Sequence, residues 1–405
     1  MSVAVITKQS RIGRILHVGL AGLAGLAGLS AAAGCGSDDS ECDVSGHACT
    51  WLGMPGQTGF NGDGHDRLDT MLYWTMDVQV GRDGAVWFID WNNHLVRKVT
   101  PDGKVVSVVG WNDPVFPGDG DQADPTAEYS AAGAPGTDVQ LNHPTDLREL
   151  SDGTILLMAW HNHKLRKIDP ATGRVWVVSG SAAGFAGDGG PATMALYKQP
   201  SHMTLDEQEN IYILDQQNLR VRKIDAQTQI ITTVAGTGVA GFAGDEGQAL
   251  QAQLNFKVGD NPEPSGGMAY QAGTLYIADS ENNRIRRIDL QTGVITTLAG
   301  TGQAGYAGDD GPAAQAMLYH PRDLEIGPDS DLYLADTDNG RIRAINLTSG
   351  VIRTVVGTGQ LGLDPDDGRL ATATQLNRPF GIAFDPKGNL FVSDSLNSRL
   401  LRVAR

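Results

Sequence analysis

The stretch that decides the fold is ADSENNRIRRID, residues 278–289, followed two residues later by TGVITTLAG, residues 292–300. It contains the end of an apolar run, a polar turn, a second run with alternating apolar positions, a glycine turn and a third run. Short β-prone runs separated by Gly, Asn and Asp are typical of antiparallel strands joined by tight turns. We therefore expect three consecutive strands of one sheet here.

The same pattern occurs six times along the chain, and an asparagine in the polar turn marks each copy. The markers lie 69, 56, 64, 57 and 58 residues apart, at Asn93, Asn162, Asn218, Asn282, Asn339 and Asn397. In the last copy we expect strands at 382–384, 390–393 and 400–403, and the fourth copy adds a fourth strand at 294–298. Four short strands in each repeat predict the blades of an all-β propeller.

The first copy spells Asn93-His94-Leu95 at its marker. With six copies of the same internal spacing, residues 48–405 resemble the NHL repeat family, whose members are six-bladed β-propellers. The sixth copy ends after its third strand, whereas residues 48–53 align with the fourth strand of another copy. We therefore expect this N-terminal strand to pair with the C-terminal blade and close the ring, which removes the exposed strand edges.

The first part of residues 1–34 contains three basic residues, Lys8, Arg11 and Arg14, and no acidic one. The rest of the segment is an apolar run of small residues. This pattern is typical of an export signal. The run ends in AAGC at 32–35, which resembles the lipoprotein box in which Cys35 is lipidated and becomes the new N-terminus. A plain signal peptide and an uncleaved membrane helix are the alternatives. The favoured interpretation is a lipoprotein of the bacterial cell envelope, facing the periplasm or the cell surface.

Residues 35–47 are rich in Ser, Asp and Gly, so we expect a flexible tether between the lipid anchor and the propeller. Two further cysteines, Cys42 and Cys49, lie seven residues apart in a chain that has three cysteines in all. In an oxidising compartment such a pair predicts a disulfide. Metal binding by two lone cysteines is the weaker alternative.

The chain carries a formal net charge of −16, and removing the three basic residues of 1–34 gives −16 − 3 = −19. Such a surface repels nucleic acid and anionic lipid, because phosphate binding needs clusters of Lys and Arg. We expect no nucleic-acid partner, membrane contact through the lipid anchor, and a monomer.

Some polar positions are shared by most copies. Five turns open with an aspartate, at Asp90, Asp215, Asp279, Asp336 and Asp394, and arginines that could pair with these acids stand seven residues after the opening position at Arg97, Arg166, Arg222, Arg286 and Arg343. The connections between copies contain GFAGD at 184–188 and 241–245 and GYAGD at 305–309. Calcium needs more oxygen ligands than each connection supplies, so we expect its aspartate to cap a short helical turn. Positions shared by the copies should serve folding.

Function should then lie where the copies differ. In a four-stranded antiparallel blade, the turn between the second and third strands lies at the same end as the connection to the next blade. At that face the first two copies depart from the others, and we expect ligand-binding side chains at Trp91, His94, His143, Trp160, His161 and His163. Trp91 and Trp160 should be exposed turn residues, and the alternative for His161 and His163 is that they are exposed turn residues that bind no ligand. The connection between these copies is also enlarged, at 111–143.

The first strands of the copies also differ near their starts. Equivalent positions hold Asp77, Asp146, His202, Gly266, Asp323 and Gly381. Converging polar groups in a concavity indicate a site, so we expect an acidic mouth that holds a cation or a polyhydroxylated or amine-bearing ligand. The alternative is that these side chains bond free backbone groups at the channel rim, or ordered water.

Three functions fit these features. The first is a lipid-anchored binding or scaffold propeller that recognises a peptide, a glycan or an envelope protein. The second is a metal-dependent enzyme, since related propellers include gluconolactonase-like hydrolases with calcium and an amidating lyase with zinc. Candidate metal ligands are Asp146, His202 and Asp323, with calcium also served by Asp77 and zinc by His143 or His163. The third is a structural spacer. No nucleophile triad is visible, so the first is favoured.

Overall fold

The computed structural model describes residues 41–111, 126–260, 262–364 and 367–405. The described residues form one compact unit. The expected signal segment 1–34 and Cys35 lie outside the described residues. In the part of the chain that is described, no helix is long and apolar enough to cross a membrane.

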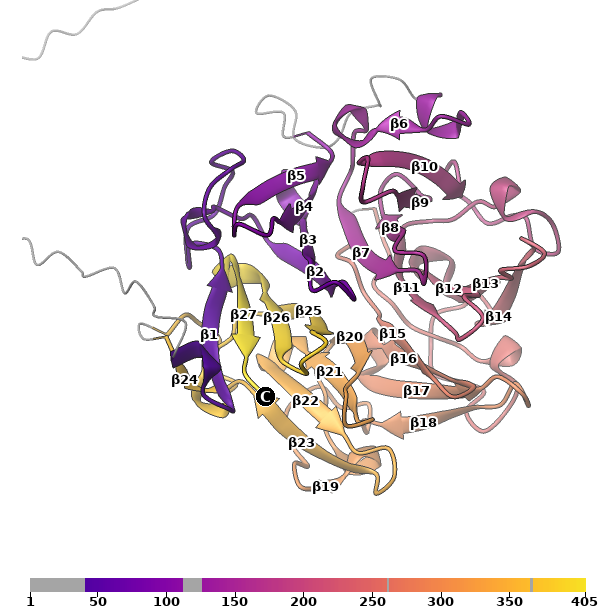
Figure 1. The fold of residues 1–405 in the computed structure, drawn as a ribbon. Helices are drawn as coiled ribbons and strands as arrows, with labels where there is room; N and C mark the ends of the chain where they lie inside the picture. The colour runs from indigo at the N-terminus through magenta and orange to yellow at the C-terminus, as the bar shows by residue number, and fades with distance from the viewer. Residues whose placement is uncertain (1–40, 112–125, 261, 365–366) are drawn as a thin grey trace, which may run out of the picture. The chain divides into compact units, whose positions relative to one another are not determined.

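Six antiparallel sheets make up the fold, and Figure 1 shows them one after another around a common centre. From the innermost strand outward, blade one contains β2 (Thr75–Val80), β3 (Val86–Asp90), β4 (Leu95–Val99) and β5 (Val105–Val109). Blade two contains β7 (Pro144–Glu149), β8 (Ile155–Ala159), β9 (Lys164–Ile168), β10 (Arg174–Ser179) and the short β6 (Ala134–Pro135). Blade three contains β11 (Pro200–Leu205), β12 (Ile211–Asp215), β13 (Arg220–Ile224) and β14 (Ile231–Ala235).

The second half of the chain repeats this order. Blade four contains β15 (Met268–Gln271), β16 (Thr274–Asp279), β17 (Arg284–Asp289) and β18 (Ile295–Ala299). Blade five contains β20 (Pro321–Ile326), β21 (Leu332–Asp336), β22 (Arg341–Ile345), β23 (Val351–Val356) and the short β19 (Gly311–Pro312). Blade six contains β25 (Pro379–Phe384), β26 (Leu390–Asp394), β27 (Arg399–Val403), β1 (His47–Leu52) and the short β24 (Arg369–Leu370).

The first strands of the blades form a closed inner ring. Contacts run from β2 to β7, β11, β15, β20, β25 and back to β2. The buried apolar side chains lie between neighbouring blades; one cluster, for example, joins Leu157 of blade two to Trp87 of blade one. The prediction of a six-bladed all-β propeller is confirmed.

The N-terminal strand closes the ring, as the sequence predicts. β1 pairs antiparallel with β27, with Thr50 opposite Leu401, and its other edge pairs with β24. Figure 1 shows the indigo β1 beside the yellow β27. A strand from the start of the described chain thus completes the sheet of the last blade.

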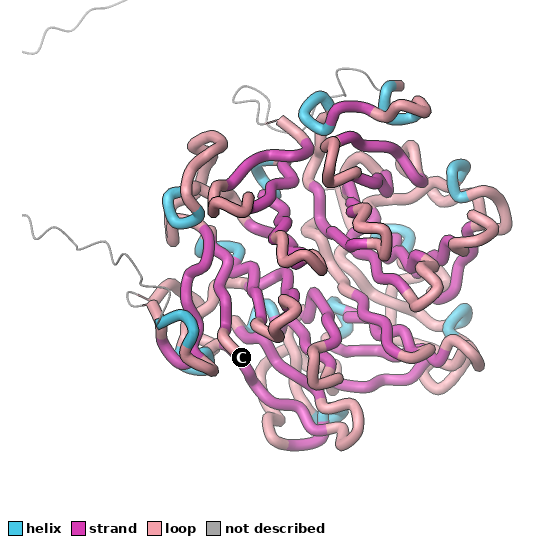
Figure 2. Tube along the Cα trace, in the orientation of Figure 1, coloured by secondary structure: helices cyan, strands magenta, loops and turns pink. Residues whose placement is uncertain are grey.

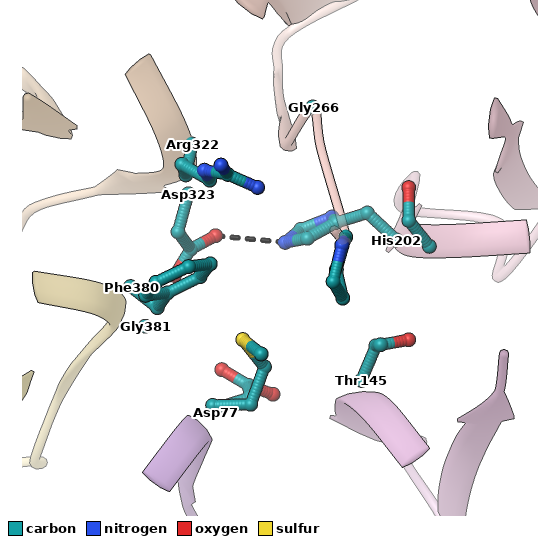
Figure 3. Close-up of a pocket in the computed structure, with 11 residues that line it drawn as sticks. Asp77, Thr145, His202, Gly266, Arg322, Asp323, Phe380 and Gly381 are labelled. Atoms are coloured by element: carbon teal, nitrogen blue, oxygen red, sulfur yellow. Dashed lines mark hydrogen bonds and ion pairs between the residues drawn. The ribbon is translucent and has the colours of Figure 1, made fainter. Parts of the chain in front are cut away.

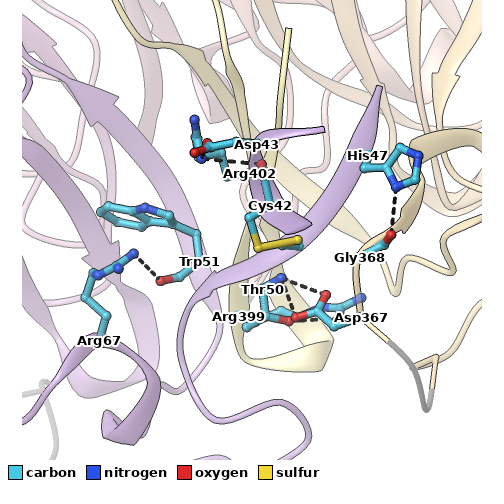
Figure 4. Close-up of a disulfide and its surroundings, with 11 residues drawn as sticks. Cys42, Asp43, His47, Thr50, Trp51, Arg67, Asp367, Gly368, Arg399 and Arg402 are labelled. Atoms are coloured by element: carbon cyan, nitrogen blue, oxygen red, sulfur yellow. Dashed lines mark hydrogen bonds and ion pairs between the residues drawn. A yellow bond between two sulfur atoms is a disulfide. The ribbon is translucent and has the colours of Figure 1, made fainter. Parts of the chain in front are cut away.

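The segment before β1 also binds to blade six (Figure 4). Cys42 and Cys49 form a disulfide, and Asp43 pairs with Arg402 at 2.9 Å. The backbone N–H of Gly46 donates to the carbonyl oxygen of Ala404. Residues 43–47, which the sequence assigns to the tether, are therefore held against the propeller.

The helices in the described residues are single 3₁₀ turns, drawn in cyan in Figure 2. Five follow the second strand of a blade: η3 (Trp91–Asn93), η7 (Gln216–Asn218), η9 (Ser280–Asn282), η11 (Thr337–Asn339) and η13 (Ser395–Asn397). The others lie in the connections and before β1: η1 (Glu41–Asp43), η2 (Arg67–Asp69), η4 (Ala127–Tyr129), η5 (Gly136–Asp138), η6 (Ala192–Met194), η8 (Ala249–Gln251), η10 (Ala313–Gln315) and η12 (Ala371–Ala373).

The shared aspartates and arginines fasten each turn to the connection that precedes its blade. In blade four, Asp279 accepts hydrogen bonds from the backbone N–H of Asn255 at 2.7 Å and from Arg286 at 3.1 Å. Arg286 also pairs with Asp245 of the preceding connection, at 2.9 Å. The expectation that Asp188, Asp245 and Asp309 cap helical turns is therefore wrong. Each pairs with an arginine of the next blade instead, and η6, η8 and η10 have no side-chain cap.

Blade two lacks the opening aspartate, because Ala159 takes its place, and two other residues replace its contacts. The side-chain oxygen of Asn162 accepts from the backbone N–H of Asn142 at 2.9 Å. Glu128, which is 1% exposed, accepts from Arg166 at 2.6 Å and from Lys164 at 2.6 Å. The enlarged connection therefore supplies the acid that this blade lacks.

Candidate functional site

Polar side chains near the start of the inner strands join neighbouring blades at the central channel. The Asp77 carboxylate accepts from the backbone N–H of Leu147 in blade two at 2.8 Å, and Asp146 accepts from Met203 in blade three at 2.6 Å. Asp323 accepts from Ile382 in blade six at 2.8 Å. Inner strands have a free edge toward the channel, so these carboxylates satisfy backbone donors that would otherwise lack a partner. These contacts match the alternative interpretation of the sequence, in which the side chains bond free backbone groups at the channel rim.

His202 makes the same contact with its ring. Nδ1 accepts from the backbone N–H of Met268 in blade four at 3.2 Å. A neutral imidazole whose Nδ1 accepts carries its proton on Nε2, and His202 Nε2 lies 2.8 Å from Asp323 Oδ1. His202 therefore connects the inner strands of blades three, four and five.

The two remaining junctions carry glycine because the strands approach too closely for a side chain. A Cβ on Gly381 would lie 2.7 Å from the Met76 carbonyl oxygen, and one on Gly267 would lie 1.9 Å from the Arg322 carbonyl oxygen. Met268 pairs with Ile277 as Leu147 pairs with Leu157. Gly267, one residue after the expected Gly266, is thus the equivalent of Asp146.

An arginine whose side chain is 11% exposed lies among the acids of the channel. Arg148 Nη1 is 3.1 Å from Asp146 and 3.8 Å from Asp77, and Nη2 is 3.8 Å from Asp323. Desolvation lowers the pKa of this guanidinium, but the charges of the neighbouring acids, Glu325 among them, raise it above its ordinary value. The acidic mouth expected from the sequence therefore contains its own cation.

Burial decides the protonation of these acids. Desolvation raises the pKa of Asp146 to about 7, although Arg148 opposes the shift. Desolvation also raises the pKa of Glu325 to about 7, and the pKa of Asp77 well above its ordinary value, with Asp146 as the next cause for Asp77. A water-poor channel disfavours the charged form of a carboxyl group. Part of the acidic charge at the channel is thus removed near neutral pH.

These groups do not fit a metal. Asp146, His202 and Asp323 do lie together, since His202 Nε2 is 3.6 Å from Asp146 and 2.8 Å from Asp323. However, Arg148 lies among them, and calcium or zinc would have to displace a guanidinium. Across the described ranges, no group of three or more His, Cys, Asp or Glu side chains is arranged to hold a metal ion.

A small hollow of about 30 Å³, partly open to solvent, lies at the channel mouth. Its lining includes Asp77, His202 and Asp323 from the expected site, together with Thr145, Arg322 and Phe380 (Figure 3). Arg322 is 4% exposed, and the Phe380 ring centroid lies 4.7 Å from its guanidinium carbon. This hollow brings together residues from several blades, which makes it the candidate binding pocket.

One side of the mouth is charged. Glu263, from the connection between blades three and four, pairs with Arg322 at 3.0 Å and with Arg378 at 2.8 Å. Arg378 also pairs with Asp338 at 2.8 Å, and Asp338 pairs with His320 at 2.6 Å. The side-chain hydrogen bond from Arg378, ahead of the other causes, lowers the pKa of Glu263 to about 2. The ion pairs hold this long connection across blades five and six.

The other side of the mouth is aromatic, and its tryptophans are buried rather than exposed. Trp160 is fully buried and Trp91 is 8% exposed. Trp91 stacks on Trp74, with ring centroids 5.7 Å apart, and Trp160 stacks on His161 at 4.1 Å. The expectation of exposed turn residues is therefore wrong for Trp91 and Trp160, because both fill the space between blades one and two.

The histidines of this region bond backbone or one another. His94, which is buried, accepts from the backbone N–H of His143 at 3.1 Å, and His163 accepts from Gln199 at 3.1 Å. His143 Nδ1 lies 3.0 Å from His161 Nδ1. Desolvation, with the neighbouring His94 and His161, lowers the pKa of His143 to about 2, and desolvation lowers that of His163 to about 4. These histidines contribute to the junctions of blades one, two and three.

Two of the residues missed by the sequence analysis had a signal. Arg148 and Glu325 stand two places after Asp146 and Asp323, and alternate residues of a strand share a face. Trp74, Arg322 and Phe380 were not singled out, because only the folded ring brings them to one mouth.

The comparisons with known proteins agree with this fold. Residues 58–241 match the family model described as Teneurin NHL domain. The chain is 24% identical over 297 residues to NHL repeat-containing protein 2 of Homo sapiens, covering 67% of this chain and 38% of that protein. It is 30% identical over 278 residues to Protein SUPPRESSOR OF QUENCHING 1, chloroplastic, of Arabidopsis thaliana, covering 64% of this chain and 25% of that protein. The chain thus spans well under half of these relatives.

Among solved structures, the chain is similar in fold to an auxiliary nutrient binding protein from Bacteroides ovatus. The TM-score is 0.60 at 15% sequence identity, and the match covers 88% of this chain and 76% of that chain. At this identity the similarity concerns the fold.

Proposed function

We propose that this six-bladed β-propeller, whose residues 58–241 match an NHL family model, is a binding protein whose ligand docks at the channel mouth. The full proposal is a lipid-anchored protein outside the cytoplasm that recognises a peptide, a glycan or another envelope protein. A structural neighbour described as an auxiliary nutrient binding protein is consistent with a binding role.

The buried guanidinium of Arg322 carries this proposal. One of its nitrogens, Nη2, bonds Glu263, whereas Nε and Nη1 have no partner among the described residues. A buried donor without a partner costs about 1–3 kcal/mol. Such a cost is expected where a ligand supplies the missing acceptor, and Arg322 lines the hollow at the mouth.

The mouth and the opposite face can be compared directly with two charge-removing variants. Arg322→Gln alters the mouth, whereas Arg82→Gln alters an exposed arginine in the turn between β2 and β3, at the other end of the blades. Purified protein is applied to peptide and glycan arrays. Binding should be lost in Arg322→Gln and kept in Arg82→Gln. The reverse pattern, or no specific binding by the wild type, would contradict the proposal.

The lipid anchor needs a separate experiment because it depends on residues outside the described ranges. Cells are labelled with a palmitate analogue and separated into membrane and soluble fractions. The wild-type chain should carry label and stay with the membrane, whereas Cys35→Ser should carry none. An unlabelled wild-type protein would exclude the anchor and leave the binding propeller itself intact.

A further inference from the structure

The aromatic side of the mouth is continuous with the pocket. Phe380 and Met76 line the hollow, and both belong to the same apolar cluster as Trp91 and Trp160. Trp74 packs against this cluster, is half-buried and stacks on Trp91 with the ring planes 9° apart. The apolar cluster against which Trp74 packs therefore reaches the polar hollow through Met76 and Phe380.

Trp74 is held rigidly at this place. It adopts the left-handed backbone conformation, with φ 59°, and its carbonyl oxygen accepts from the backbone N–H of Trp91 at 3.0 Å. The neighbouring Tyr73 is 40% exposed and meets Trp74 edge to face. A rigid aromatic ring loses little conformational entropy when a ligand covers it.

The hollow offers both hydrogen-bond donors and acceptors that lack partners among the described residues. Arg322 supplies two donors, Nε and Nη1. The hydroxyl group of Thr145 can do either. A ligand hydroxyl also donates and accepts, so it can serve both kinds of group.

The charges at the mouth favour a neutral ligand. Arg148 lies among the acids of the channel, so a cationic group would meet a guanidinium. An anion would meet Asp323 and Glu263 in a chain of net charge −16. A group without charge avoids both repulsions.

We propose that the mouth binds the neutral sugar rings of an oligosaccharide, with one ring stacked on Trp74 and its hydroxyl groups bonded to Arg322 and Thr145. The inference rests on the proposed binding function and selects the glycan among its possible ligands. A sugar ring combines an apolar C–H face, which suits an aromatic ring, with hydroxyl groups around its edge. A peptide is the alternative that the experiment tests.

The full chain, purified in detergent, is titrated by calorimetry with neutral oligosaccharides of glucose, mannose, xylose and N-acetylglucosamine. A pool of neutral peptides is titrated in parallel. At least one oligosaccharide should bind, and Trp74→Ala and Arg322→Gln should each weaken its binding about tenfold or more. Trp74→Phe keeps a flat ring and should retain most of the affinity. Trp176→Ala, at a half-buried tryptophan of β10, is the matched control and should change the affinity by about twofold at most.

The outcomes separate the two proposals. If no oligosaccharide binds but a peptide does, and Arg322→Gln abolishes its binding, the sugar inference fails and the binding mouth stands. If an oligosaccharide binds equally well to wild type, Trp74→Ala and Arg322→Gln, the mouth is the wrong site and both proposals fail. Thermal midpoints of all variants identify any loss of binding caused by unfolding.

Discussion

The Asp146 carboxylate accepts a 2.6 Å hydrogen bond from the backbone N–H of Met203 in the next blade. Its other oxygen lies 3.1 Å from Arg148 Nη1. One side chain thus joins two inner strands and compensates the guanidinium. The same residue looks like a metal ligand in the sequence, and the difference lies in what surrounds it in the closed ring.

The first prediction concerns the pH dependence of stability. Burial raises the pKa of Asp146 in the folded protein to about 7, whereas the unfolded chain has the ordinary value of about 4. Between these values the folded state binds more protons, so wild-type stability from this group falls as pH rises. Asp146→Asn keeps an acceptor for Met203 but cannot ionise. Its stability relative to wild type should therefore increase by about 1 kcal/mol per pH unit from roughly pH 4.5 to 6.5.

Urea unfolding at several pH values measures this difference. Asp289→Asn is the control, because Asp289 is exposed at the end of β17. A difference between Asp146→Asn and wild type that does not change with pH would show that Asp146 is ionised throughout.

The second prediction concerns Trp160, which fills the junction of blades one and two. Trp160→Ala should lower the free energy of unfolding by about 3–5 kcal/mol, because a large buried side chain leaves a cavity. Trp111→Ala is the control, since Trp111 is 41% exposed, and it should change stability by less than about 0.5 kcal/mol. Equal effects in chemical unfolding would place Trp160 outside the core.

The ring and its closure could be predicted from the sequence because they depend on features that every copy repeats. Asn282 and Asp279 recur at fixed spacing, and the fourth strand missing from the last copy is found at the start of the propeller. The exposure of Trp91 and Trp160 could not be predicted, because turn residues are usually exposed. These tryptophans are buried because they pack into the apolar cluster between blades one and two.

The candidate site was predictable only in part. The inner-strand positions of Asp77, Asp146, His202 and Asp323 follow from the repeat. Their bonding to backbone of the next blade does not, since it depends on the distance between blades. Arg322 and Phe380 meet at the hollow only after the ring has closed.

The third prediction concerns ring closure. A chain that begins at Met54 lacks β1 and exposes the edge of β27, so it should aggregate or unfold at a lower temperature. A chain that begins at Asp38 keeps the whole compact unit and should have the thermal midpoint of the full chain. Size-exclusion chromatography and thermal unfolding compare the two. An unchanged midpoint and monomeric elution for the shorter chain would show that β1 is dispensable.

The fourth prediction concerns the acid that replaces the missing aspartate of blade two. Glu128 is buried and pairs with Arg166 and Lys164, each at 2.6 Å. Glu128→Ala should lower the free energy of unfolding by about 3–5 kcal/mol, because it leaves a buried guanidinium without its partner. Ala159→Asp restores the carboxylate that the other five blades carry at this position. In the Glu128→Ala background it should recover part of the loss, whereas Ala159→Asp alone, with two acids around Arg166, should not stabilise. Double-mutant analysis by urea unfolding tests this coupling. Strictly additive effects would mean that the two positions do not serve the same arginine.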